Sequence, residues 1–180
     1  GSCYFSFTGT LMTLTRREVA KASLGAASLT MLWSSGALAD AARLMTKTIP
    51  SSDEQLPVIG LGTNRYGVGQ TETARAPLRA ALERFHRLGG SVIDTAPMYR
   101  TSESVLGDLI AELGIREDLF LATKADRTDS GAGTMEQMQE SMSRLKTDRI
   151  DLMQVHNLRG WRHALPAMRD WQQEGRIRYI

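Results

Sequence analysis

The sequence predicts an α/β fold in which parallel strands alternate with single helices. From about residue 58 onward, short apolar runs alternate with segments whose apolar residues recur at helical spacing. Three of the runs end at Asp94, Lys124 and His156, which follow one another after 30 and 32 residues. That period is about the length of one β–α–β unit. Because a TIM (β/α)₈ barrel takes about 250 residues, we expect this chain to supply only about the first five strands of one.

The composition is that of an ordinary globular protein. The chain has 180 residues, of which 42% are apolar and 23% charged, with a formal net charge of +2. These values exclude a disordered or collagen-like chain, and the small net charge gives no reason to expect a nucleic-acid partner. Cys3 is the one cysteine. An internal disulfide, a thiolate nucleophile in the body of the chain and a cysteine zinc site are therefore excluded.

Residues 12–39 have the features of an export signal. Arg16 and Arg17 precede a weakly apolar stretch that ends in the cleavage-site pattern Ala37-Leu38-Ala39. The stretch is too polar for a membrane span, which needs roughly 20 mostly apolar residues. The paired arginines and the low hydrophobicity resemble a twin-arginine signal. We therefore expect the twin-arginine export machinery as a partner, a periplasmic or otherwise exported location, and no stable membrane span after signal removal.

A soluble amphipathic helix with an accidental arginine pair is the alternative interpretation of this segment. Residues 1–11 precede Met12, a natural start, and are interpreted as an upstream or extraneous segment. Residues 40–57 are predicted to form a linker and a hairpin, whose turn runs through Pro50–Asp53. Residues 58–180 are predicted to form the partial barrel.

The first barrel elements are a strand, a helix and a second strand. The apolar run Val58–Gly62 predicts a buried strand. Helical spacing predicts a helix over about Arg75–Leu88, with Pro77 in its first turn and a glycine pair after its end. Ser91–Asp94 is predicted as the second strand.

The same alternation continues to the last residue. Thr134 and Gln137 are interpreted as a capping box, with the methionines that follow on the buried face of that helix. The predicted elements are a helix capped by Thr101 or Ser102 and closed by Gly114, a strand over Leu119–Lys124, the helix with buried Met135, Met138, Met142 and Leu145, a strand over Ile150–His156, a helix ending at Gly175, and a fifth strand over Ile177–Ile180.

Four chemically active side chains follow these strands. Asp94, Lys124 and His156 each end a different strand, and Tyr99 lies five residues after Asp94. Each alone has a structural explanation: a solvated strand end for the two charges, a half-buried aromatic for Tyr99, a hydrogen-bonded structural histidine for His156. In a parallel barrel, however, the carboxyl ends of the strands converge on the face where active sites lie. Their joint placement predicts one shared pocket.

Other chemistries lack their motifs. Arg65 stands where the third glycine of G-x-G-x-x-G belongs, and neither a P-loop nor a G-x-S-x-G elbow is present. His86 and His163 fall on predicted helices, and no acidic or histidine cluster has the spacing of a metal site. We therefore expect no metal.

Six motifs together resemble the aldo-keto reductase family, in order and at similar spacing from about Met45 to the end. Arg100 departs from the family, many of whose members carry glycine there; this affects the shape of the loop and the substrate fit. The motifs are Leu61-Gly62-Thr63, Asp94–Tyr99, Ser102–Gly107, Ala122–Lys124, Ile150–Asn157 and Ile177–Ile180.

The resemblance implies a TIM barrel that uses NADPH to reduce a small aldehyde or ketone to an alcohol, taking hydride from the cofactor. Tyr99 would be the general acid. A phenol has a pKa near 10, and a neighbouring ammonium, that of Lys124, favours the phenolate. Asp94 would hold Lys124, and His156 would orient the carbonyl. The cofactor NADPH or NADP would contact Gly62, Thr63, Asp94 and Asn157.

Two other functions remain open from the sequence. One is a non-catalytic regulatory subunit that binds a nicotinamide nucleotide in a reductase-like barrel. The other is an unrelated barrel enzyme, for example a hydrolase that uses Asp94. The loops that hold much of NADPH in the family follow strands seven and eight, outside these 180 residues. We therefore expect the chain alone to be inactive.

Overall fold

A computed structural model describes residues 6–7, 10–11, 44–127 and 129–180. The chain divides into two units, Gly1–Arg43 and Leu44–Ile180. In the first unit, β1 (Ser6–Phe7) pairs antiparallel with β2 (Thr10–Leu11). The export signal predicted over residues 12–39 lies outside the described residues. Within the part that is described, no helix is both long enough and apolar enough to span a membrane.

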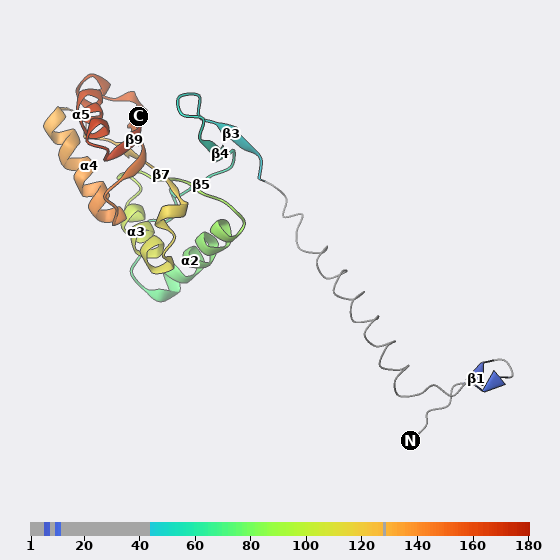
Figure 1. Ribbon diagram of the computed structural model, residues 1–180. Helices are drawn as coiled ribbons and strands as arrows, with labels where there is room; N and C mark the ends of the chain where they lie inside the picture. Colours follow the sequence, from blue (N-terminus) through green and yellow to red (C-terminus); the bar gives the residue numbers. More distant parts are fainter. Residues whose placement is uncertain (1–5, 8–9, 12–43, 128) are drawn as a thin grey trace. The chain divides into compact units, whose positions relative to one another are not determined.

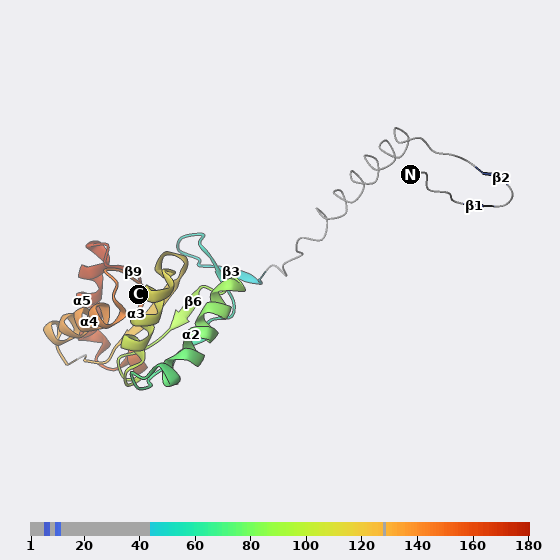
Figure 2. The ribbon, with the colours of Figure 1, turned by 90° about the horizontal axis from the view of Figure 1, so that it is seen from below.

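The second unit is built on a five-stranded parallel sheet. Each strand pairs with the next one along the chain, and the helices between them lie along one side of the sheet (Figures 1 and 2). This is the order of the first five strands of a β/α barrel, as predicted. The strands are β5 (Leu61–Gly62), β6 (Val92–Asp94), β7 (Phe120–Ala125), β8 (Ile150–Val155) and β9 (Ile177–Tyr179); the helices are α2 (Glu72–Arg87), α3 (Ser102–Leu113), α4 (Gly131–Leu145) and α5 (Trp161–Gln173).

The core lies between the sheet and these helices. Ile93, Leu121 and Met153 are fully buried on the three central strands and belong to one apolar cluster with helix residues such as Leu106 and Met168. Alternate residues of a strand face opposite sides. On the other side Val92, Phe120, Ala122, Leu152 and Tyr179 help to line a cavity of about 420 Å³.

An antiparallel hairpin covers part of this second face. It consists of β3 (Thr46–Thr48) and β4 (Gln55–Pro57), at the predicted position. Ile49, Ser51 and Leu56 of the hairpin line the same cavity. The hydroxyl of Tyr179 donates to Glu54 at 2.6 Å, which ties the hairpin to β9.

The apolar run Val58–Gly62 was wrongly predicted as a buried strand. Val58 is 47% exposed and Ile59 is 73% exposed, and β5 contains only Leu61 and Gly62. The amide of Val58 donates to the carbonyl of Met45, at 3.0 Å. The first half of the run therefore continues the hairpin instead of entering the core.

The start of α2 also differs from the prediction. The helix begins at Glu72, and Thr71 caps it by accepting a hydrogen bond from the amide of Ala74, at 3.4 Å. Pro77 consequently lies in the second turn and not in the first. At the other end the prediction is confirmed, because Gly89 has a left-handed φ of 85°.

Two predicted helix caps are wrong in their chemistry. Helix α4 begins at Gly131, and its capping side chain is Ser130, whose Oγ accepts from the amide of Gly133 at 3.0 Å. Thr134 and Gln137 do not form a capping box; they hold the loop that precedes the helix, and Met135 is partly exposed. Thr101 precedes α3 but makes no side-chain cap there, since its hydroxyl donates to the carbonyl of Val68.

Candidate active site

Lys124 and Asp94 form the charged centre of the site. Asp94 is the last residue of β6 and Lys124 the last but one of β7, and the register places Asp94 beside Ala122, two residues before Lys124. Lys124 Nζ donates to Asp94 Oδ1 at 2.8 Å, to Asp94 Oδ2 at 2.7 Å and to the carbonyl of Thr95 at 2.7 Å. The lysine is 12% exposed and the aspartate 41%. The cation is thus held in one place while the carboxylate faces the solvent.

Tyr99 lies beside this ion pair, on the loop between β6 and α3. The loop is a tight turn in which the amide of Tyr99 donates to Ala96 and its carbonyl accepts from Ser102, both at 3.0 Å. The centre of the phenol ring is 5.2 Å from Lys124 Nζ. The ring of His156 meets it edge-on, at 6.4 Å between centres and 88° between planes. The structure therefore brings together the four side chains that the sequence singled out, whereas their chemical roles stay predictions.

Gln154 belongs to this site although its role was not predicted. Its Nε2 donates to Asp94 Oδ1 at 3.2 Å, so that this oxygen accepts from both Lys124 and Gln154. The strand predicted to end at His156 ends at Val155, and His156 begins a short 3₁₀ turn. Gln154 pairs in register with Lys124 of β7, so the two side chains face the same side of the sheet.

Asp126 is a second residue that the prediction missed. It directly follows β7, two positions after Lys124, and one oxygen of its carboxylate is hydrogen-bonded to Nδ1 of His156. Asp126 and His156 are mostly buried, with 16% and 17% of their side chains exposed. Its spacing of two residues from Lys124 indicated that Asp126 lies on the same side as the lysine. Its hydrogen-bond partner, His156, follows a different strand and could not be inferred from that spacing.

The residues predicted to contact a cofactor differ in their accessibility. Gly62 is exposed, and a Cβ there would meet no atom within 4 Å. Asn157 is also exposed, with a left-handed φ of 54°. Thr63 is fully buried, and its hydroxyl donates to the carbonyl of Asp94 at 2.9 Å. Gly62 thus leaves its backbone open, and Asp94 and Asn157 expose polar groups. The hydroxyl of Thr63, in contrast, is used in its hydrogen bond to Asp94.

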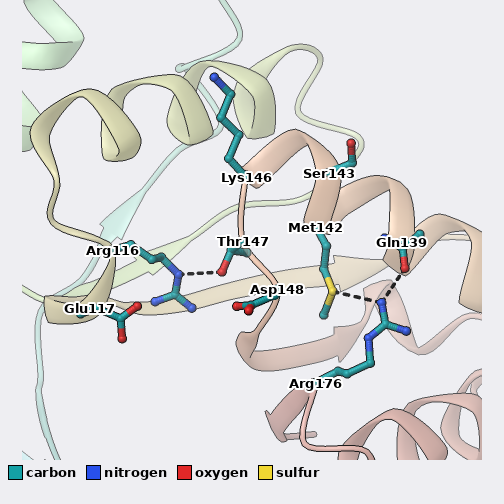
Figure 3. Close-up of a pocket in the computed structure, with 9 residues that line it drawn as sticks. All are labelled: Arg116, Glu117, Gln139, Met142, Ser143, Lys146, Thr147, Asp148 and Arg176. Atoms are coloured by element: carbon teal, nitrogen blue, oxygen red, sulfur yellow. Dashed lines mark hydrogen bonds between the residues drawn. The ribbon is translucent and has the colours of Figure 1, made fainter.

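A larger hollow, of about 640 Å³, lies at the opposite ends of the strands (Figure 3). Its lining includes Thr147 and Asp148, which precede β8, and Arg176, which precedes β9. The cationic groups there already have partners. Arg116 donates to Thr147, and Arg176 donates to Gln139 (Figure 3). Arg116 also donates to buried Asp151. The side chains of this hollow therefore hold neighbouring elements together, and the hollow is not the candidate active site.

Comparison with known proteins agrees with this geometry. Residues 58–180 match the model of the Aldo/keto reductase family. Aldo-keto reductase YhdN of Bacillus subtilis (strain 168) is 35% identical in an alignment of 145 positions that covers 68% of this chain and 41% of that protein. Methylglyoxal reductase YeaE of Escherichia coli (strain K12) is 34% identical in an alignment of 135 positions that covers 71% of this chain and 45% of that protein.

The solved structures give the same result. An aldo-keto reductase from Klebsiella pneumoniae, crystallised in complex with NADPH, is 32% identical with a TM-score of 0.64; the match covers 76% of this chain and 49% of that one. The chain thus spans less than half the length of each of these three relatives. Since the family model matches well over half of its residues, the chain belongs to the aldo/keto reductase family.

Proposed function

We propose that the protein containing this chain reduces the carbonyl group of aldehydes or ketones to an alcohol, with NADPH as the reductant. The observation that carries this proposal is the position of Tyr99, whose ring lies 5.2 Å from the Asp94-held ammonium of Lys124 and edge-on to the ring of His156. A phenol beside a fixed cation and an imidazole is suited to proton transfer with a carbonyl oxygen.

Each side chain has a separate part in the proposed reaction. The hydroxyl of Tyr99 gives its proton to the carbonyl oxygen. The ammonium of Lys124 stabilises the phenolate that remains, and Asp94 balances the charge of that ammonium and keeps it in place. His156 hydrogen-bonds to the carbonyl oxygen and orients it. NADPH, when bound, supplies the hydride.

The choice of NADPH is supported by a relative and by the exposed edge of the site. The Klebsiella pneumoniae relative was crystallised with NADPH. In this chain, Gly62 of β5 leaves its backbone open, the half-exposed carboxylate of Asp94 ends the neighbouring strand β6, and the amide of Asn157 follows β8. We propose that these three residues face the nicotinamide end of the cofactor.

The hydrogen bonds of Asp94 disfavour the interpretation of this chain as a hydrolase that uses Asp94. Both oxygens of Asp94 accept hydrogen bonds from Lys124, and one also accepts from Gln154. A carboxylate held in this way is a poor nucleophile or base. A regulatory subunit would retain the same contacts, so only turnover separates it from an enzyme.

The test is a steady-state assay on the full-length protein. Oxidation of NADPH is followed by its absorbance with a panel of aldehydes and ketones that includes methylglyoxal, since one relative is a methylglyoxal reductase. We expect turnover with at least one substrate and formation of the alcohol in equal amount. Tight NADPH binding without turnover of any carbonyl would favour the regulatory subunit instead.

We also propose that the protein is exported through the twin-arginine pathway, because Arg16 and Arg17 precede a weakly apolar stretch and an Ala37-Leu38-Ala39 site. The test replaces both arginines by lysine and measures the protein in periplasmic and cytoplasmic fractions of a bacterial host. We expect the wild type in the periplasm and the variant in the cytoplasm. Equal distribution of the two would contradict the proposal.

A further inference from the structure

The contact between Asp126 and His156 assigns a proton to one nitrogen of the imidazole ring. An ionised carboxylate can only accept hydrogen bonds. Asp126 Oδ1 is hydrogen-bonded to Nδ1 of His156, so an ionised Asp126 requires a hydrogen on Nδ1. In a neutral ring the other nitrogen, Nε2, is then bare. It is also the nitrogen on the far side of the ring from Asp126, and thus the one left for a substrate.

The backbone at Asp126 is held in place by two side chains of helix α4. Gln137 Oε1 accepts hydrogen bonds from the backbone amides of Asp126 and Arg127, at 2.6 and 2.7 Å. Thr134 Oγ1 donates to the carbonyl of Arg127 at 2.9 Å. Gln137 and Thr134 are both buried. The loop after β7 is therefore fixed on both sides of Asp126, and so is the point at which His156 is bonded.

The two oxygens of the Asp126 carboxylate differ in their partners. Oδ1 is hydrogen-bonded to His156, whereas Oδ2 is buried and has no hydrogen-bond partner among the described residues. A buried carboxylate whose hydrogen bond goes to a histidine of the site points to an effect on that histidine.

We propose that Asp126 is a positioning residue that fixes the proton of His156 on Nδ1 and directs Nε2 to the substrate side, next to Tyr99. When the ring is neutral, Nε2 can only accept a hydrogen bond. When solvent supplies a second proton to the ring, Asp126 balances the charge of the imidazolium, and Nε2–H donates to the carbonyl oxygen. This role in the reaction rests on the proposed reductase function, whereas the tautomer of His156 can be tested without it.

His86 provides an internal reference. Its Nε2, and not its Nδ1, is bonded to a carboxylate, that of Asp118, at 2.9 Å. The same argument therefore predicts the opposite tautomer for His86, with the hydrogen on Nε2.

The first test is nuclear magnetic resonance of the full-length protein labelled with ¹⁵N in its histidine rings, at a pH where the rings are neutral. Long-range ¹H–¹⁵N correlations identify the nitrogen that carries hydrogen, and His156→Gln identifies the signals of His156. We expect hydrogen on Nδ1 for His156 and on Nε2 for His86. Hydrogen on Nε2 of His156 in the wild type would overturn the proposal.

Three variants show whether Asp126 is the cause. Asp126→Ala removes the acceptor, and we expect His156 to change to the tautomer with hydrogen on Nε2. Asp126→Asn keeps an acceptor oxygen, so the Nδ1–H tautomer should persist. Asp129→Ala, which removes an exposed aspartate of the same loop, should leave the tautomer unchanged. A melting curve for each variant shows that it is folded, and an unchanged tautomer in folded Asp126→Ala would also overturn the proposal.

Kinetics test the consequence for the reaction. We expect Asp126→Ala to lower kcat by about tenfold or more, Asp126→Asn to restore part of the loss, and Asp126→Ala to have no further effect in a His156→Gln background. Additive losses would show that Asp126 does not act through His156. If the wild type turned over no carbonyl, the proposed function would fail while the tautomer result stood.

Discussion

The ammonium of Lys124 donates to both carboxylate oxygens of Asp94, at 2.8 and 2.7 Å. The two residues lie on neighbouring strands, and a third hydrogen bond to the carbonyl of Thr95 completes the donor set of the lysine. All three hydrogens of the ammonium are therefore used in holding it near the Tyr99 ring. The carboxylate, not the lysine, is the exposed member of the pair.

Replacing Asp94 by Asn tests this arrangement. The amide has the same shape but no charge, and its nitrogen cannot accept from Lys124. We expect the ammonium of Lys124 to keep its hydrogen bond to the carbonyl of Thr95 but to be held less firmly beside Tyr99. We therefore expect kcat to fall roughly 10–100-fold, which is part of what acid–base catalysis contributes. The measurement is steady-state reduction of an aldehyde by the full-length protein. A kcat equal to that of the wild type would show that Asp94 does not hold the lysine for the reaction.

Gly67 sets the position of the Tyr99 loop. A Cβ at residue 67 would lie 2.7 Å from the carbonyl oxygen of Tyr99 and 2.9 Å from Cβ of Arg100. Gly67→Ala must therefore displace this turn, and we expect a roughly 10–100-fold loss of kcat, because small misplacements of reacting groups are costly. Gly69→Ala is the matched control, since a Cβ there meets nothing within 4 Å. Equal kcat for the two variants would contradict the prediction.

Arg100 occupies a backbone conformation that favours glycine. Its φ is 58°, in the left-handed region. The loop thus keeps the shape expected for a glycine although the sequence has arginine. We expect Arg100→Gly to raise the free energy of unfolding by about 1 kcal/mol, since a non-glycine residue pays about that much in this conformation. Met98→Gly, at an exposed position of the same loop without positive φ, should lower the free energy of unfolding. Urea unfolding at pH 7 measures this free energy for both variants. A lower value for Arg100→Gly than for the wild type would contradict the prediction.

Asp108 links three helices through charge. Its carboxylate is 2.7 Å from Lys146 after α4 and 2.7 Å from Arg75 on α2. The hydrogen bond from Lys146 and that from Arg75 hold the pKa of Asp108 below its ordinary value of 3.8, against the opposing effect of burial. Because the pKa is lower in the folded protein, the carboxylate contributes stability above about pH 4 and loses that contribution as the pH falls further.

We therefore expect Asp108→Asn to lower the free energy of unfolding by roughly 1 kcal/mol at pH 7, and by less at pH 3. Urea unfolding at the two pH values gives the difference. Asp170→Asn is a suitable control, because Asp170 is exposed and has no ion pair among the described residues. The same loss for Asp108→Asn at both pH values would exclude the ionised carboxylate as the cause.

The fold and the four central residues could be predicted because both depend on strand order. Apolar runs identify parallel strands, and in a parallel sheet the residues after successive strands meet at one edge. Asp94, Lys124 and His156 needed no further information to be placed together. Local motifs were less reliable. Thr134 and Gln137 fit a capping box, but Ser130 caps α4 instead, and Gln137 binds the loop at Asp126.

Contacts between distant segments could not be predicted from one sequence. Val58 and Ile59 were assigned to the core because they are apolar, yet the backbone of Val58 pairs with Met45. Buried Glu103 accepts from Arg144, 41 residues later, and from Thr123, next to the lysine of the site. The local sequence around these residues does not indicate which distant residues they contact. The contacts that support the site could therefore be identified only in the structure.

The most direct measurement of the central claim uses Tyr99→Phe in the full-length protein. The substitution removes one oxygen and leaves the ring that contacts Lys124 and His156. We predict that NADPH-dependent reduction of an aldehyde falls by at least 10²-fold, as expected for the loss of a general acid, while the dissociation constant for NADPH changes less than twofold. Turnover equal to that of the wild type would show that Tyr99 is not the proton donor.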